Sequence, residues 1–539
     1  MSISRATWPR RSRSNSPATI PALVKPRAIA LLLACAAALA AIVDGCGGGN
    51  SGSGDVDVGP AAAVPQNAAL YLDGTVNPTG SAEADARAAA AKIMGTNDPG
   101  GKIVSLIERE AKADGHPIDY QRDVAPWLGE KAGVFFTSLA DNAEKGAVVV
   151  QTTDVNASLA FARKASGSTP TNPAPRTYKG VSYQTDPSQA RNVFGVVGNF
   201  LVEGDRAGFR AAVDASQGES LGDSSDFKDA IGDLPDDRLG TIYTIPKSLL
   251  GALGPGQIDA SSRQLLEKSA GDSLQQPVSG AITASATNID LEATGGSNGV
   301  DTPQSSLIGD VPSGAWLALG AADLGDAVKR TLDQVKDSIP NFDQAVQQLE
   351  AATGSSLDQL TGSLGNAALY VEGTTPSTLT GALMVQSRNP DLTGRLISQL
   401  RSLLQISGST GVKPLHLSGG GSGFQINDPS AAPAPVEIAQ QGDRIVIGYG
   451  AGSAERTLSP AQNLQSSPIF STAHGQVSSL GTDFFLDLPS VFRLAQSTGS
   501  KSDPDYVRAK PYLDALSYVV TGSGTNGDQA EFKAVVGLR

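Results

Sequence analysis

The chain has 539 residues, of which 40% are hydrophobic, 18% charged and 5% aromatic. This apolar content is enough to build a buried core and excludes a wholly disordered chain. The 41 basic and 54 acidic residues give a net charge of −13. An acidic surface repels phosphate backbones, so nucleic acid is excluded as an expected partner.

The N-terminus has the features of an export signal. The first 27 residues carry six basic side chains and no acidic one, and they lead into the uncharged apolar run Ala28–Val43. Cys46 follows this run and precedes a Gly/Ser-rich stretch. The order resembles a bacterial lipoprotein signal, which implies that Cys46 is lipidated and becomes the new N-terminus. An uncleaved helical anchor and an ordinary signal peptide are the open alternatives.

The sequence after the N-terminal segment indicates an internal duplication. Five sequence blocks recur in the same order with nearly constant spacing, and one of them aligns Leu128-Gly129 with Leu364-Gly365. Because there are two long copies, the pattern indicates tandem domains rather than a solenoid. The expected division is a signal peptide (1–45), a flexible leader (46–64), a first repeat domain (65–296), a linker (297–310) and a second repeat domain (311–539).

Within each copy, short strands are mixed with amphipathic helices. Residues 133–139 and 147–152 are rich in β-branched and aromatic residues and predict strands, after which Asp154 is expected to cap a helix. The segments 194–204 and 436–450 predict hairpins. Each copy is expected to close with a helix and a further hairpin. Strands that come in local pairs favour an α+β fold, in which two tandem copies have antiparallel sheets backed by helices.

These features together resemble a known family. An N-terminal lipoprotein-like leader, the block from Asp123 through Trp127 to Gly129, and the strand around residues 147–152 are similar to the bacterial domain of unknown function 3352 family, which is common in actinobacteria. The resemblance implies an exported protein. It implies no activity, because the family has none assigned.

The tryptophans of the body are expected to be structural. Pro126 and Gly129 shape a turn around Trp127, so the indole and the adjoining Leu128 are predicted to pack over the sheet as anchors. Stacking on a ligand is the alternative for Trp127. Trp316 lies inside a predicted strand and is expected to be a core anchor as well.

The sequence has few motifs typical of catalytic or metal-binding sites. The three histidines, His116, His416 and His474, lie far apart and lack the spacing of a zinc helix, so we expect no metal and no cofactor. Ser297 lies in a Gly-x-Ser-x-Gly pattern, but linker sequence follows it where a nucleophile elbow needs a helix. The acidic run over residues 223–237 predicts helix caps and a solvated face, with a calcium site as the alternative.

The sequence therefore predicts a non-enzymatic, lipid-anchored envelope protein on the extracytoplasmic face of the cell membrane, acting as a binding or scaffold module. Its expected partners are the membrane, through the lipid anchor, and either an apolar ligand or another envelope protein. The alternative is a carrier that encloses a lipid or another apolar ligand between sheet and helices, with the alanine-rich stretch 81–94 as a wall of small residues. An envelope hydrolase is the least favoured class.

Overall fold

The computed structural model describes residues 58–539 apart from positions 79, 114, 116, 141–143, 188, 190, 255, 297–304, 306, 337, 338, 340, 407–410, 429, 431 and 528. Cys46, His116 and Ser297 therefore lie outside the described residues. In the part of the chain that the structure describes, no helix is both long and apolar enough to cross a membrane.

The first half of the chain supplies ten strands: β1 (Leu70–Thr75), β2 (Leu128–Ser138), β3 (Lys145–Thr152), β4 (Arg176–Tyr178), β5 (Val181–Thr185), β6 (Asn192–Val197), β7 (Phe200–Asp205), β8 (Gly240–Thr244), β9 (Val278–Ala284) and β10 (Asn288–Gly296). Its helices are α2 (Gly80–Met94), α3 (Pro99–Ala113), α4 (Tyr120–Asp123), α5 (Val155–Ser166), α6 (Arg206–Gln217), α7 (Ser225–Gly232), α8 (Pro246–Ala252) and α9 (Ala260–Ala270).

The second half also supplies ten strands: β11 (Ala315–Ala321), β12 (Leu364–Glu372), β13 (Thr380–Ser387), β14 (Val412–His416), β15 (Ser422–Ile426), β16 (Val436–Gln441), β17 (Arg444–Tyr449), β18 (Phe484–Asp487), β19 (Leu516–Asn526) and β20 (Gln529–Leu538). Its helices are α10 (Leu324–Val335), α11 (Phe342–Thr353), α12 (Leu357–Gly362), α13 (Pro390–Ile406), α14 (Ser453–Leu458), α15 (Pro468–Gln476), α16 (Leu488–Ser497) and α17 (Pro504–Leu513).

Local predictions from the sequence are confirmed. The Asp154 carboxylate accepts hydrogen bonds from the backbone N–H groups of Asn156 and Ala157 and so caps α5. The predicted hairpins are β6–β7 and β16–β17, and each half ends with a helix and a hairpin. The fold is α+β, as predicted.

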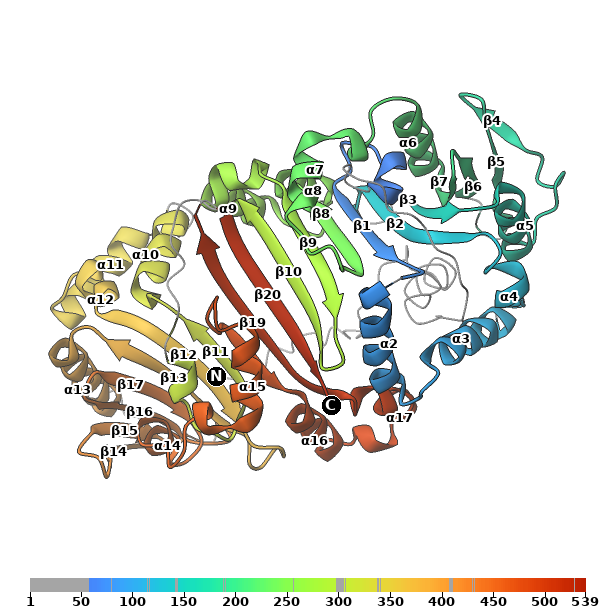
Figure 1. Cartoon of the computed structure of the whole chain (residues 1–539). Helices are drawn as coiled ribbons and strands as arrows, with labels where there is room; N and C mark the ends of the chain where they lie inside the picture. Colours follow the sequence, from blue (N-terminus) through green and yellow to red (C-terminus); the bar gives the residue numbers. More distant parts are fainter. Residues whose placement is uncertain are drawn as a thin grey trace, which may run out of the picture.

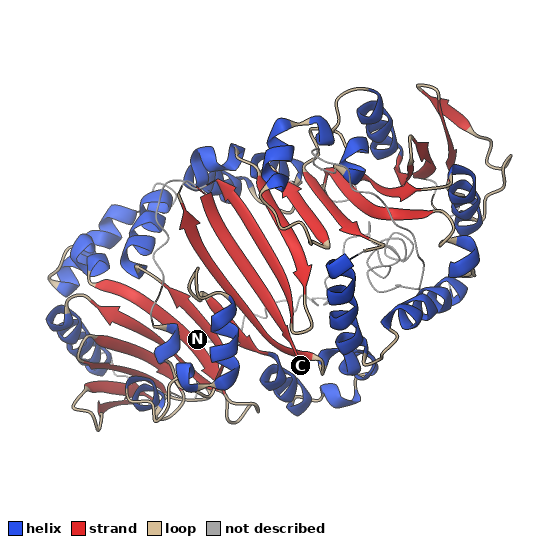
Figure 2. Ribbon diagram, viewed as in Figure 1, coloured by secondary structure: helices blue, strands red, loops and turns tan. Residues whose placement is uncertain are grey.

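All the strands belong to one 20-stranded antiparallel sheet (Figure 1, Figure 2). Pairing gives the order β4-β5-β6-β7-β3-β2-β1-β8-β9-β10 and then β20-β19-β18-β11-β12-β13-β17-β16-β15-β14. Counted outward from the junction of β10 and β20, the two halves have the same order. The sequence left open whether the two halves share a sheet, and they do, because β10 and β20 pair along their lengths and join the two sets of strands.

The body begins earlier than the sequence suggests. The 3-10 helix η1 (Gly59–Ala63) falls in the predicted leader, yet Ala61, Ala63 and Val64 are buried in the core. Likewise, Leu307 and Ile308 fall in the predicted linker but are buried in the core of the second half. Both segments are short and apolar, so burying them stabilises the fold even though neither has the pattern of a helix or strand.

Alternating side chains place a core on each face of the first half. In β2, Phe135 packs with Tyr71 and Phe209 on one face, whereas Val134 packs with Trp127 on the other. In the second half one face is buried around a core that includes Tyr370, Met384, Phe470 and Phe485.

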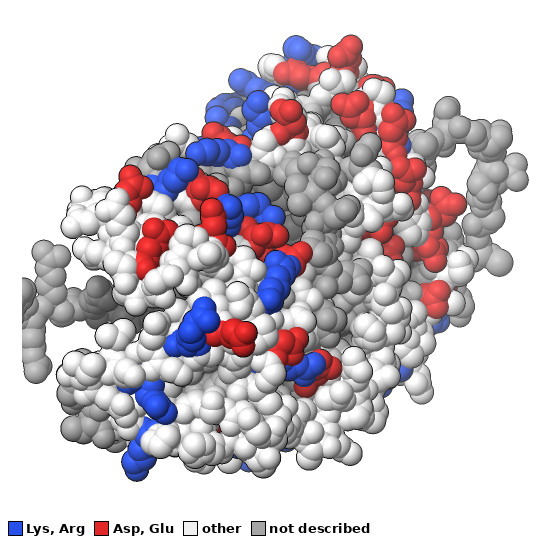
Figure 3. All heavy atoms as spheres, turned by 90° about the vertical axis from the view of Figure 1, so that its left-hand side faces the viewer, with Lys and Arg blue, Asp and Glu red and all other residues white. Residues whose placement is uncertain are grey.

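The opposite face of the second half is only partly covered. Leu319 of β11, Leu369 of β12 and Ile447 of β17 are 40%, 37% and 46% exposed. In the view of this end of the molecule, charged side chains gather in the upper part and along one edge, and the lower part is largely uncharged (Figure 3).

Candidate functional site

An apolar pocket of 410 Å³ lies between α2 and the sheet of the first half. Alanines on α2 form one wall of it, together with residues at the C-terminal end of the helix: Ala86, Ala89, Ala90, Ile93 and Met94. A methyl group reaches only a short way from the helix axis, so an alanine face leaves space that longer side chains would fill. The alanine-rich stretch, which the alternative hypothesis of a carrier named as a wall, therefore lines a cavity in the structure.

The floor of the pocket is one face of the sheet. Leu72, Val134 and Val148 occupy neighbouring positions on β1, β2 and β3 and point to this face because successive strand residues alternate. Gly74 of β1 and Gly240 of β8 pair directly and also border the pocket. Two glycines side by side leave the floor without side chains at this point, which deepens the cavity.

The remaining lining comes from α3, the start of β8, and the β9–β10 hairpin, and it is apolar: Ile103, Leu239, Ile282, Ala284 and Ile289. The volume falls in the range of pockets that hold small organic ligands, about 300–1,000 Å³. Among the described lining residues, Asp73 has the one ionisable side chain. An interior with so few polar groups favours an apolar ligand over a charged one.

Asp73 is held by its own strand. The Tyr71 hydroxyl donates a hydrogen bond to Asp73 Oδ2 at 2.9 Å. Burial raises the pKa of Asp73 above its ordinary value, and the hydrogen bond from Tyr71 and the charge of Lys131 offset part of this rise. Successive strand residues alternate, so the Asp73 carboxyl lies on the Tyr71 side of β1, opposite Leu72, and offers no polar contact inside the pocket.

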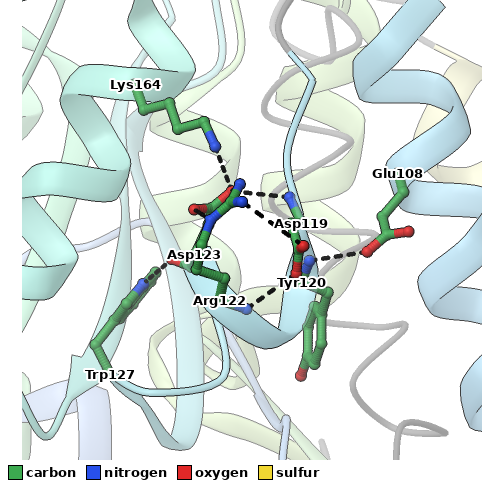
Figure 4. Close-up of polar contacts among 7 residues, drawn as sticks. All are labelled: Glu108, Asp119, Tyr120, Arg122, Asp123, Trp127 and Lys164. Atoms are coloured by element: carbon green, nitrogen blue, oxygen red, sulfur yellow. Dashed lines mark hydrogen bonds and ion pairs between the residues drawn. The ribbon is translucent and has the colours of Figure 1, made fainter.

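Trp127 lies in the turn before β2 (Figure 4) and belongs to the same apolar cluster as Val134 and Val148. Its side chain is 2% exposed and packs on Phe161 with 5.3 Å between ring centroids. The indole Nε1 donates to the Asp123 carbonyl oxygen at 2.7 Å. With both its ring and its N–H satisfied inside the protein, Trp127 has no face open for stacking on a ligand.

The short helix α4 holds this turn through charged groups (Figure 4). Asp119 accepts a hydrogen bond from the Arg122 backbone N–H at 3.1 Å, and the Asp119 N–H donates to Asp123 Oδ2 at 2.8 Å. The Arg122 guanidinium donates twice to the Asp123 carboxylate, at 2.9 and 3.1 Å. This contact, helped by Lys164, holds the pKa of Asp123 well below its usual range. Glu108 of α3 accepts from the Tyr120 N–H at 2.9 Å and ties the two helices together.

The other proposed anchors lie at strand positions. Leu128 begins β2 and is half-buried, and Gly129 lies where a Cβ would come within 2.7 Å of the Gln151 side chain. Trp316 of β11 is half-buried, and its Nε1 donates to the Gly373 carbonyl oxygen at 2.7 Å. The structure thus buries Trp127 more deeply than Trp316.

The described residues hold no cluster of three or more histidine, cysteine, aspartate or glutamate side chains arranged for a metal. His416 and His474 are both exposed, and His474 Nδ1 lies 2.8 Å from the Thr482 hydroxyl. In the acidic run, Asp223 accepts hydrogen bonds from Ser220 in a capping box, as predicted for helix caps.

Fold and pocket together define a class: an α+β protein with one long antiparallel sheet and an apolar cavity between that sheet and a helix. The chain belongs to the family described as "Protein of unknown function (DUF3352)", whose profile matches residues 27–527. No curated protein sequence matches the chain.

Solved structures show only distant likeness. Crystal form III of TP0453 matches with a TM-score of 0.22 and 10% identity, covering 43% of this chain and 93% of that one. Crystal form I of the same protein matches with a TM-score of 0.15 and 11% identity, covering 76% and 99%.

Proposed function

We propose that this chain is a non-catalytic, lipid-anchored binding protein on the extracytoplasmic face of the cell membrane, and that it holds an apolar ligand such as a lipid beneath α2. The observation that carries the proposal is the 410 Å³ pocket with its alanine wall and glycine-paired floor. The proposed location at the membrane is supported by the basic segment, the apolar run and Cys46 at the N-terminus.

The lining favours binding over catalysis. Hydrolysis needs a nucleophile, a base that activates it and donors that stabilise developing charge, all within hydrogen-bond reach. Among the described lining residues only Asp73 has an ionisable side chain, and its carboxyl lies on the Tyr71 side of β1, away from the pocket. A ligand there is enclosed by aliphatic side chains, which stabilise an apolar molecule by about 25 cal/mol per Å² of buried surface.

An internal duplication is part of the proposal. The equal strand order on either side of β10–β20 supports it. Among the described residues, three α-helices lie between β1 and β2 and three between β11 and β12, which supports it as well. Duplication of a single unit explains why five sequence blocks recur in the same order. Only the first copy has then kept the alanine helix that leaves a cavity.

Extraction of the purified protein tests the ligand. We expect mass spectrometry to find about one apolar molecule per chain in the wild type. Ala89→Phe places a ring in the pocket and should abolish this ligand, whereas Ala84→Phe, on an exposed position of the same helix, should keep it. If Ala89→Phe and Ala84→Phe contained the same amount of ligand, or if the wild type contained none, binding beneath α2 would be contradicted.

Metabolic labelling with a fatty acid tests whether the protein is lipid-anchored through Cys46. The wild type should carry label and sediment with membranes. Cys46→Ser should lose the label and change fraction, while Cys35→Ser, in the apolar run itself, should behave as the wild type does. A Cys46→Ser protein that is still labelled would rule out this cysteine as the anchor.

A further inference from the structure

A second pair of cavities lies beneath α13 at the far end of the sheet. A polar cavity of 250 Å³ is enclosed by α13 and by strands β14, β15 and β16. An apolar cavity of 290 Å³ lies beside it, between α13, α12, β12 and β17. Ile397 lines both, so the two spaces adjoin along one side of the same helix.

Arg401 is the cation of the polar cavity. Its Nε is buried and has no hydrogen-bond partner among the described residues, and no acidic side chain lines the cavity. A buried guanidinium N–H without a partner costs free energy, because it has lost water and gained no acceptor. The His416 side chain also lines the cavity, and no hydrogen bond of its ring is found among the described residues. The cavity therefore presents a guanidinium donor that lacks an acceptor.

The glycines around this cavity have a structural explanation. Gly420 has φ of +87° in the turn between β14 and β15, and a Cβ on Gly423 would lie 2.0 Å from the Ile438 carbonyl oxygen. They allow β15 to approach β16 and need not bind a phosphate. Glu455 accepts a hydrogen bond from the Ser418 N–H at 3.1 Å and steadies the turn. Arg401, and not the glycine-rich sequence, is therefore the feature that points to an anion.

The adjoining cavity has the opposite character. Its lining is mostly aliphatic: Leu360, Leu364, Leu396, Ile397 and Ile445, with Thr361, Ser363 and Thr393 beside them. The Thr393 hydroxyl donates to Gln440 Oε1 at 3.1 Å, and Gln440 lines the polar cavity. One pair of bonded side chains therefore marks the boundary between a polar space with an unpaired cation and an apolar space.

We infer that this pair of cavities binds an amphiphilic anion, with a carboxylate or phosphate headgroup at Arg401 and an apolar tail against Leu396 and Ile445. The guanidinium matches an oxyanion by donating parallel hydrogen bonds, which an uncharged headgroup cannot accept equally well. The site is separate from the pocket beneath α2, so it does not depend on the function proposed for that pocket.

Isothermal titration of the full-length protein with dodecyl phosphate, dodecanol and inorganic phosphate tests the site. We expect Arg401→Gln to weaken dodecyl phosphate at least tenfold and Arg401→Lys to restore part of the affinity. Arg395→Gln, an exposed arginine on the same helix, should leave the affinity unchanged. Because the pocket beneath α2 also admits an alkyl chain, all titrations are repeated with Ala89→Phe, where the dependence on Arg401 should persist.

Each other outcome overturns the inference in a defined way. Inorganic phosphate that binds as tightly as dodecyl phosphate would show a site for a free anion without a tail. Dodecanol binding that equals dodecyl phosphate binding, or an affinity unchanged by Arg401→Gln in a variant that melts like the wild type, would remove Arg401 from the site.

Discussion

The two halves of the sheet have the same strand order but cover one face differently. In the first half, Leu72 pairs with Val134, and the face that they share is packed by α2, α3 and α5. In the second half, Leu319 pairs with Leu369 at the matching place, and both remain exposed. Strand order thus does not determine how the helices between strands are used.

The helices themselves account for this difference. α3 buries Ile103 and Ile107 against its surroundings. α11, in the matching part of the second half, has no buried residue among those described, and Leu349 on it is 42% exposed. A helix without a buried apolar face gains little by packing on a sheet. The first half therefore has an apolar pocket beneath a helix, and the second has an open apolar face with cavities at its end.

The largest expected effect is that of a charge placed at matching positions. Val134 is 6% exposed, so Val134→Asp should cost about 4 kcal/mol or more, because an unpaired carboxylate or its neutralisation is costly in an apolar interior. Leu369→Asp should cost about 1 kcal/mol, since water reaches that position. Urea unfolding of both variants measures the comparison. Equal losses would mean that the face of the second half is covered in solution.

The two tryptophans, Trp127 and Trp316, allow a second comparison of burial between the two halves of the sheet. Trp127→Ala should cost about 3–5 kcal/mol, because it leaves a cavity beside Phe161 and frees the Asp123 carbonyl. Trp316→Ala should cost about half as much, because that side chain is already partly exposed. Trp127→Phe keeps an aromatic ring and removes the N–H, so it should lower the free energy of unfolding by only about 1 kcal/mol relative to the wild type. A larger loss at Trp316 would reverse the assignment of Trp127 as the main anchor.

Local structure was predictable from the sequence and long-range structure was not. Asp154 and the hairpin around Gly198-Asn199 follow from side chains within a few residues, so capping and turn rules suffice for them. The pairing of β10 with β20 joins segments more than 200 residues apart, and no local pattern specifies a partner at that distance.

The candidate sites divide in the same way. The alanines of α2 could be recognised as a small-residue wall, but the space also depends on Gly74 lying beside Gly240, which only the β1–β8 register creates. Arg401 gave no signal, because its isolation is a property of three strands and a helix that meet around it. A sequence pattern thus shows that a helix has residues small enough to line a cavity. It does not show which strand residues will lie opposite that helix.

The smallest expected effect concerns acid titration of the turn before β2. The pKa of Asp123 is lowered in the folded state by Arg122 and Lys164, from an ordinary value of 3.8. The carboxylate therefore contributes stability that is complete above about pH 4 to 5 and is lost as the pH falls through the folded-state pKa. Asp123→Asn should cost about 1–2 kcal/mol at pH 7, and its difference from the wild type should shrink in acid.

Asp358 of α12 provides the matched control in the second half. It pairs with Lys329 at 2.7 Å, but both side chains are exposed, so solvent and salt screen the pair. Asp358→Asn should change stability little at any pH. Denaturant midpoints between pH 2 and pH 7 compare the two variants. If both show the same pH dependence, the charged contacts that hold the Trp127 turn add nothing beyond an ordinary surface pair, and the turn is held by packing alone.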